Sequence, residues 1–161
     1  MSRQLEMTIP MTPRGKPRHR TMKGGRTYPD PKGAKWEDEF AWHVRSKMRD
    51  GMWTADVALK VDVVAYFGRT ADEAKQYKNG QHKYLKCELA CLVKPDLDNV
   101  LKIALDALNG VLFHDDKQVV VGTVIKCKCA IGDRPRVWFR VSELKVDGLT
   151  SEIAKLRGGT R

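Results

Sequence analysis

The sequence predicts an α+β domain in which one mixed β-sheet is covered by two helices, in the order β-α-β-α-β-β. Four stretches alternate apolar and polar residues with a period of two, as strands do, and two others repeat apolar residues at helical spacing. The length of 161 residues is enough for one core and too short for two well-formed domains. We therefore expect residues 1–161 to form a single domain.

The first elements follow from short patterns. Leu5 to Ile9 alternate and stop at Pro10, which indicates a short strand. Residues 13–31 carry several prolines and glycines, so they are expected to form a loop, here called the basic arm. Residues 34–48 place Trp36, Phe40, Val44 and Met48 on one side of a helix that Gly51 ends.

The second half of the chain continues the alternation of strands and helices. Residues 57–67 alternate most clearly and end at Gly68, whereas residues 69–90 form a polar connection with no assigned element. Residues 99–108 predict a mostly buried helix that stops at Asn109-Gly110. Residues 119–129 and 137–144 are strands, expected to form a hairpin around the turn 132–135, and residues 147–161 are expected to be a frayed tail or a short helix.

The composition favours a polyanionic partner. There are 30 Lys and Arg against 20 Asp and Glu, which gives a net charge of +10, and the pI is about 9.6. Surplus cations that only keep a small protein soluble are the alternative. Cations aligned along the basic arm favour contacts with nucleic-acid phosphates. They are Arg14, Lys16, Arg18, Arg20, Lys23 and Arg26.

Membrane and zinc-binding classes receive little support. No run reaches the roughly 18 to 20 apolar residues of a membrane span, and the N-terminus lacks the apolar run of a signal peptide, so we expect an intracellular, cytoplasmic protein. The four cysteines, Cys87, Cys91, Cys127 and Cys129, are then expected to be free thiols. Their spacings depart from the usual zinc patterns, so zinc is not expected as a cofactor.

The acidic residues between positions 96 and 116 form the main chemical signal. In an extended lead-in to the second helix, Asp96 and Asp98 would point the same way, and paired carboxylates suit Mg²⁺. Either residue alone could be an ordinary helix cap. A second pair, Asp115 and Asp116, is not explained in that way, and carboxylates that converge repel one another unless a cation lies between them.

One polar stripe crosses the second predicted helix. Asp98, Lys102 and Asp106 are spaced by four residues and share one helix face. They could form i,i+4 ion pairs of a few tenths of a kcal/mol each. Alternatively, Lys102 could contact a scissile phosphate and offset charge in the transition state. The spacing leaves both interpretations open.

The segment KPDLDNVLKIALDALNGVLFHDDKQVV, residues 94–120, resembles the signature of the RusA family of crossover junction endodeoxyribonucleases. The resemblance implies a homodimer in a bacterial or phage-infected cell that binds a four-way DNA junction and nicks two strands symmetrically. By motif position, the family's essential acids fall on Asp96, Asp98 and Asp116, and its lysine falls on Lys102. Asp115 also matches the motif, as a further metal ligand. The implied cofactor is Mg²⁺, with Mn²⁺ as a substitute.

Two other functions remain compatible with the residues. The protein could be a metal-dependent nuclease for other branched DNA, such as flaps or forks. It could also be a DNA-binding module without activity, whose aspartates only cap helices and form ion pairs. Substrate comparison separates the first from junction cleavage, and replacement of the aspartates separates the second.

Overall fold

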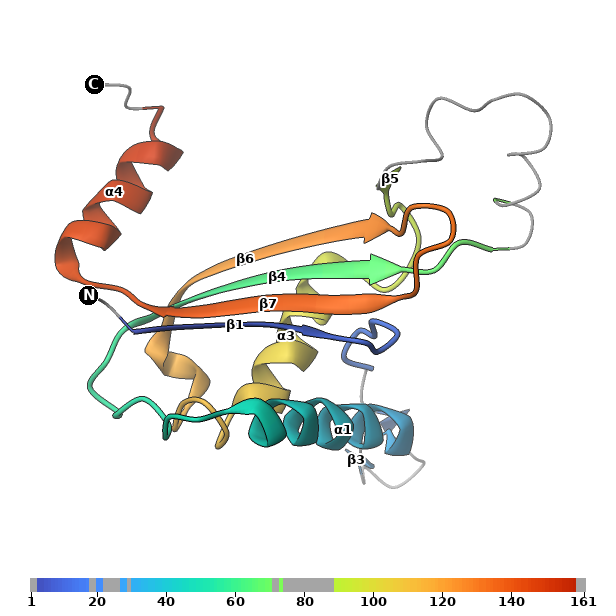
Figure 1. Cartoon of the computed structure of the whole chain (residues 1–161), viewed down its shortest axis with the longest axis horizontal. Helices are drawn as coiled ribbons and strands as arrows, with labels where there is room; N and C mark the ends of the chain where they lie inside the picture. The colour runs from blue at the N-terminus through green and yellow to red at the C-terminus, as the bar shows by residue number, and fades with distance from the viewer. Residues whose placement is uncertain are drawn as a thin grey trace.

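The computed structural model describes residues 3–17, 20–21, 27–28, 30–70, 73 and 89–158. Its main feature is a five-stranded sheet in the order β1-β7-β4-β6-β5 (Figure 1). The strands are β1 (Gln4–Ile9), β4 (Leu59–Phe67), β5 (Leu89–Ala90), β6 (Val119–Lys128) and β7 (Arg136–Glu143). Within the basic arm, β2 (Arg20–Thr21) and β3 (Thr27–Tyr28) form a separate two-stranded sheet. The predicted α+β class with a mixed sheet is confirmed.

The predicted hairpin between the last two long strands is wrong. β4 lies between them: it pairs parallel with β6, from Leu59↔Val119 onward, and antiparallel with β7. The connection between Lys128 and Arg136 is long enough to pass over one intervening strand, because neighbouring strands lie only about 4.8 Å apart. Alternation shows which face of a strand is buried but does not identify its neighbours.

Two helices cover the same face of the sheet and enclose the core (Figure 1). Helix α1 (Pro31–Lys47) begins at the N-cap Asp30, whose side chain accepts a hydrogen bond from Gly33 N. Helix α3 (Leu97–Leu108) packs beside α1 and against β6. Phe40, Phe113 and Phe139 are among the largest side chains that are fully buried between these layers.

Helix α3 starts two residues earlier than the predicted helix 99–108. The helix begins at Leu97, so Asp96 is its N-cap and Asp98 lies in the first turn. The expectation that Asp96 and Asp98 both belong to an extended lead-in is therefore wrong for Asp98. Pro95 keeps Lys94 out of the helix, since the residue before a proline avoids the helical region. Asp96 then provides the first helical acceptor through its carbonyl oxygen, which binds Val100 N at 3.2 Å.

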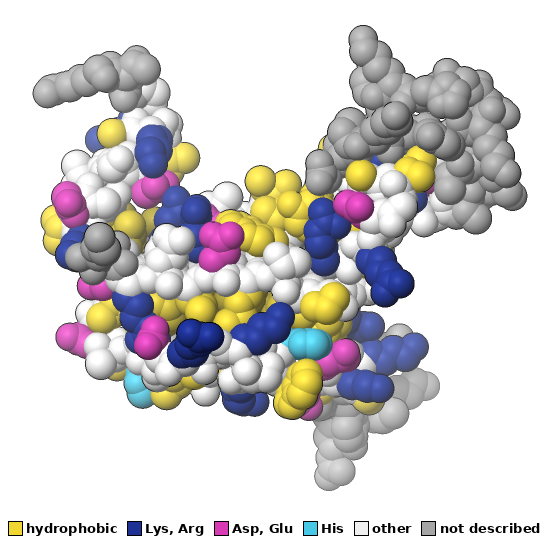
Figure 2. Space-filling model, viewed as in Figure 1, with side chains coloured by type: hydrophobic (Ala, Val, Ile, Leu, Met, Phe, Trp, Pro, Cys, Tyr) yellow, Lys and Arg dark blue, Asp and Glu magenta, His cyan; other side chains and the backbone are white. Residues whose placement is uncertain are grey.

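The opposite face of the sheet is not covered by α1 or α3. The C-terminal helix α4 (Val146–Leu156) lies at one end of this face, and Lys60 on β4 holds it through an ion pair of 3.0 Å to Glu152. The short terminal helix allowed by the sequence is thus present. Figure 2 shows a hollow beside α4 in which hydrophobic side chains reach the surface. Asp62 lies on this face too and accepts two hydrogen bonds from the Arg140 guanidinium.

Among the residues that the structure describes, no helix combines the length and the apolar character that a membrane span requires.

Candidate active site

The N-terminal part of the basic arm is docked onto the start of α3. Lys16 N donates a hydrogen bond of 2.8 Å to the carbonyl oxygen of Asn99. The adjacent Gly15 lies so close to Pro95 that a Cβ at position 15 would be 2.3 Å from the Pro95 Cβ. Glycine is therefore required for this close approach, and it lets the arm form one wall of the site.

Lys16 joins the arm to both helices. Its ammonium lies 2.7 Å from Glu37 on α1 and 2.7 Å from Asp106 on α3. Burial alone would lower the pKa of Lys16, but the hydrogen bonds to Asp106 and Glu37 outweigh it and raise the pKa above its usual 10.5. The side chain is thus a charged link between three segments.

A pocket of about 610 Å³ opens between the arm and the N-terminal end of α3. Apolar side chains of Phe67 and three prolines form part of its lining, and its polar lining includes Arg14, Lys94, Asp96 and Asn99. Its volume is in the range of small-ligand sites. The pocket therefore places three cations, Arg14, Lys16 and Lys94, and one carboxylate beside a helix N-terminus, where the helix dipole also favours an anion.

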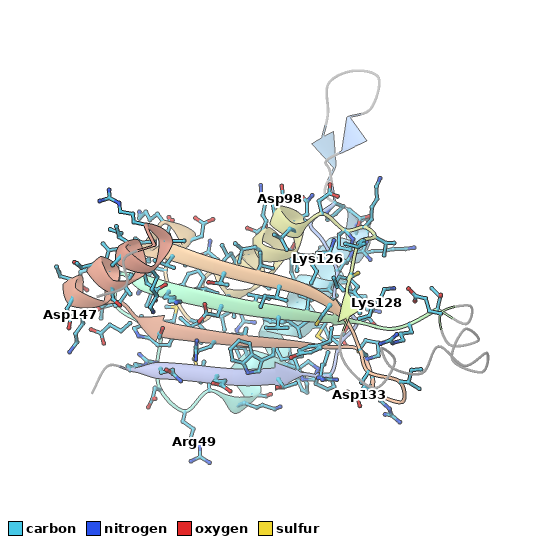
Figure 3. All side chains as sticks on the ribbon, turned by 90° about the horizontal axis from the view of Figure 1, so that it is seen from above. Arg49, Asp98, Lys126, Lys128, Asp133 and Asp147 are labelled. Atoms are coloured by element: carbon cyan, nitrogen blue, oxygen red, sulfur yellow. The ribbon has the colours of Figure 1, made fainter. Side chains whose placement is uncertain are left out.

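The first acidic pair lies at the mouth of this site. Asp96 and Asp98 are exposed, and the Asp96 side chain makes no capping hydrogen bond. Lys126 on β6 fixes the loop before them, because its ammonium donates to the carbonyl oxygens of Val93, at 2.8 Å, and of Pro95. In Figure 3, Asp98 lies beyond β6, on the side of the sheet opposite to β1. The loop is held in place while the carboxylates stay open to solvent.

The second acidic pair precedes β6. Asp115 caps the short helix η3 (Asp116–Gln118) by accepting a hydrogen bond of 2.9 Å from Lys117 N. This bond lowers the pKa of Asp115, with a smaller contribution from the Lys117 charge. The loop is anchored by the buried Gln118, whose amide group donates to Thr54 O at 2.8 Å. Asp116 is exposed.

The two acidic pairs lie toward opposite ends of α3. Asp96 and Asp98 begin this helix of 12 residues, which is about 18 Å long at 1.5 Å per residue. The chain then turns back, and Asp116 comes just before the first residue of β6, while Lys126 near the other end of that strand contacts Pro95. In the described part of the chain, no group of three or more acidic, His or Cys side chains is placed to hold a metal ion.

The polar stripe of α3 is divided between two environments. Asp106 is paired with Lys16 from the arm. Lys102 is exposed, and no ion pair between it and Asp98 or Asp106 is found among the described residues. The i,i+4 interpretation of this stripe is therefore not what the structure shows, and the Lys102 ammonium is open to a ligand.

The predicted DNA contacts of the arm are only partly described. Arg14 is paired with Asp30 at 2.8 Å and Lys16 with Glu37 and Asp106, so both have protein partners. Arg18, Lys23 and Arg26 lie outside the described residues, as does the side chain of Arg20. Lys94 also lines the pocket, although the sequence did not identify it as a cation of the site. Its position directly before Pro95-Asp96 could have indicated that it lies close to the acidic residues.

The cysteines lie near one end of the sheet. Cys91, Cys127 and Cys129 are free and buried, and Cys87 lies outside the described residues. The Cys129 thiol donates to Arg134 O at 3.4 Å, and burial raises its pKa.

Comparison with known proteins gives two matches. Residues 10–142 match the family model described as endodeoxyribonuclease RusA, a range that contains both acidic pairs and the α3 motif. The chain is also 30% identical over 131 residues, which cover 81% of this chain and 88% of the relative, to the uncharacterized protein YqaN of Bacillus subtilis (strain 168).

Proposed function

Because the chain belongs to the RusA family of endodeoxyribonucleases, we propose that it resolves four-way DNA junctions by paired, symmetric nicks, using Mg²⁺ held by its aspartates. The observation that carries the proposal is the position of Asp96 and Asp98 at the start of α3, beside a pocket that also presents Arg14 and Lys94. Carboxylates next to cations are what a metal-assisted attack on a phosphodiester requires.

The donor set fits a hard divalent cation. Nucleases of this family generally depend on a divalent metal. Asp96 and Asp98 supply exposed carboxylate oxygens, the ligands that Mg²⁺ prefers, and their exposure leaves room for water and phosphate oxygens. Mn²⁺ accepts similar oxygen ligands and should substitute. When bound there, the ion supplies an activated water and stabilises the displaced oxygen.

Cations around the acids have separate roles in this proposal. Lys102 is one helical turn beyond Asp98 and exposed, so it would contact the scissile phosphate and offset negative charge that develops there. Lys94 and Arg14, in the pocket wall, would hold the adjoining backbone of the strand. The remaining basic-arm residues would extend this contact along the phosphates.

A single chain does not complete the set of acids that the family resemblance implies. Mg²⁺ holds its ligands at about 2.1 Å, whereas α3 separates Asp98 from Asp116 by much of its length of about 18 Å. The third acid of each site would then come from a second copy. We therefore infer a homodimer with two shared sites, which suits two symmetric cuts.

The cleavage test uses a four-way junction labelled in turn on each strand, with matched duplex, flap and fork substrates, in Mg²⁺, Mn²⁺ or EDTA. Asp98→Asn should abolish nicking and keep junction binding. Asp147→Asn is the matched control, since Asp147 occupies the first turn of α4 as Asp98 occupies that of α3. If the protein cleaves flaps or forks in preference to junctions, then those structures are its substrate. Binding without cleavage under every metal condition would leave only a DNA-binding module.

The shared site has its own test. Asp98→Asn and Asp116→Asn proteins, each inactive alone, are mixed and allowed to exchange subunits. In a mixed dimer one shared site carries both substitutions and the other carries neither. One of the two sites in each mixed dimer should therefore nick DNA, and the products should be single-strand nicks. If each site lay within one chain, every site would carry a substitution, and activity would stay absent.

A further inference from the structure

We propose that the pocket between the basic arm and the start of α3 receives one unstacked base of the DNA strand that is cut, and that the Asn99 amide group recognises the edge of this base. This inference rests on the proposed function and deepens it, because it assigns a class of ligand to the cavity beside Asp96. The phosphate of the same nucleotide stays at the mouth of the pocket, near the exposed side chains of Lys94 and Asp96.

The walls of the pocket suit a flat ring better than a phosphate group. Pro13, Pro17 and Pro95 line it from the arm and from the loop before α3, and Phe67 adds an aromatic side chain. Apolar walls offer no partner to phosphate oxygens, whereas any base can stack on an aromatic side chain through its π-face. The volume of about 610 Å³ is also large enough for a whole base.

The alternation of β4 explains why Phe67 is available to a ligand. Val61, Val63 and Ala65 point to the helix side of the sheet, and each is at most 1% exposed. Phe67 continues this row at the last position of β4, but it is only half-buried. The core row thus ends in an aromatic side chain that the arm and α3 leave partly uncovered, and it lines the pocket.

The protein itself compensates much of the charge in the pocket. Arg14 is paired with Asp30 at 2.8 Å. Lys16 is paired with both Glu37 and Asp106. A phosphate group inside the pocket would be repelled by these three carboxylates while it is attracted by the two cations, whereas an uncharged base is not repelled. The charge balance therefore favours a base inside the pocket and its phosphate outside.

Asn99 supplies the hydrogen bonds that distinguish one base from another. It is the third residue of α3, and it lines the pocket. Its backbone oxygen accepts a hydrogen bond from Lys16 N, whereas its side-chain amide has no hydrogen-bond partner among the described residues. A side-chain amide carries a donor and an acceptor side by side, so it can bind a base edge that offers the complementary pair through two hydrogen bonds.

The pocket is formed before DNA binds. The backbone of Gly15 lies against Pro95, and the Lys126 ammonium donates a hydrogen bond to the Pro95 carbonyl oxygen. On the arm side, the Trp36 indole nitrogen donates a hydrogen bond of 2.9 Å to Thr12 O. Because both walls are already fixed, little conformational freedom is lost when a ligand enters.

A base beside a branch point is the easiest one to bring into such a pocket. Inside a continuous duplex, a base can leave only if its pairing and its stacking on both neighbours are broken. The crossover of a four-way junction already interrupts the stack, so less is lost there. The pocket therefore favours cleavage near a branch point over cleavage within a duplex, which agrees with the junction substrate proposed above.

The first experiment detects the unstacked base by fluorescence and needs no cleavage. Four-way junctions carry a single 2-aminopurine in turn at each position near the crossover, and the full chain is added in EDTA until a gel shift shows that all the junction is bound. Emission should rise by about twofold or more at one position or its direct neighbours, because 2-aminopurine is quenched while it is stacked. A bound junction with no rise at any position would overturn the inference.

Two variants test the contacts in the pocket. Asn99→Ala and Phe67→Leu change half-buried side chains, so the fold should persist by circular dichroism. Each should reduce the rise in emission by at least about half, while junction binding through the phosphates persists. Asn109→Ala is the matched control, since Asn109 is exposed at the opposite end of α3 and should keep the full rise. A rise that both pocket variants keep would place the unstacked base elsewhere and overturn the inference.

Cleavage in Mg²⁺ then tests what the amide group recognises. Junctions that differ only in the base at the identified position are compared. The wild type should cut one of them at least about tenfold faster than the slowest, whereas Asn99→Ala should cut all of them at similar rates. A preference that Asn99→Ala retains would refute the role of Asn99.

The two readouts separate this inference from the proposed function. An unstacked base without cleavage under any metal condition would refute the nuclease activity and leave the base pocket standing. Cleavage of junctions in which no base becomes unstacked would leave the nuclease activity standing and refute the base pocket.

Discussion

Replacement of Lys16 by methionine should destabilise the fold by about 2–3 kcal/mol. The ammonium makes two contacts of 2.7 Å, to Glu37 and Asp106, and only 23% of its side chain is exposed. A hydrogen bond to a charged group contributes about 1.5–3 kcal/mol net. The two contacts would together give about 3–6 kcal/mol, and we reduce this to about 2–3 kcal/mol because the carboxylates left behind, at 23% and 25% exposure, can regain some water. The melting temperature should fall by about 4–12 °C.

Urea unfolding followed by tryptophan fluorescence measures this loss, with Lys102→Met as a control, since Lys102 is exposed. The folded-state pKa of Lys16 is raised, so its contribution is complete below 10.5 and disappears as pH rises through the higher folded-state value. The difference between wild type and Lys16→Met should therefore be constant at neutral pH and shrink only in strong alkali. A loss no larger than that of Lys102→Met would refute the role of Lys16 as a link between segments.

Three further perturbations test other parts of the structure. Gly15→Ala should displace the arm from α3, because the new Cβ would meet Pro95, and junction cleavage should fall at least about tenfold while the far-ultraviolet spectrum is kept. Asp62→Ala should cost about 1–3 kcal/mol in urea unfolding, since Arg140 loses two hydrogen bonds; an unchanged midpoint would show that solvent replaces them. Glu152 has a pKa lowered by hydrogen bonds from two lysines, so the attachment of α4 should be complete above pH 4.5 and weaken as pH falls through the lower folded-state value. Hydrogen exchange in α4 that does not depend on acid pH would contradict this.

The long strands and the helices of the fold could be predicted from the sequence to within a few residues, whereas the two-residue strands β2, β3 and β5 could not. Local periodicity of apolar residues predicts strands and helices. For example, the predicted strand 57–67 contains the observed strand Leu59–Phe67. Helix α1 begins at Pro31, three residues before the predicted helix 34–48, because proline is well suited to the first helical turn behind a capping Asp30.

Strand neighbours and the arrangement of the acids were beyond local patterns. The position of β4 between β6 and β7 depends on contacts between distant segments, which alternation does not encode. The motif indicated that Asp96, Asp98 and Asp116 act together, but α3 lies between the two groups in space. The partners of Lys16 were also unpredictable, because Glu37 and Asp106 belong to two helices whose packing had to be known first.

The pairing of β1 has a consequence for the order of folding during synthesis. β1 is an edge strand whose partner is β7, so Gln4 pairs with Ser142 and Ile9 with Val137. The first strand to leave the ribosome is thus among the last to find its place, and it must remain unpaired until nearly the whole chain has emerged. Such a distant pairing makes folding slow relative to helical proteins of similar size. Until β7 arrives, this segment is open to capture by chaperones.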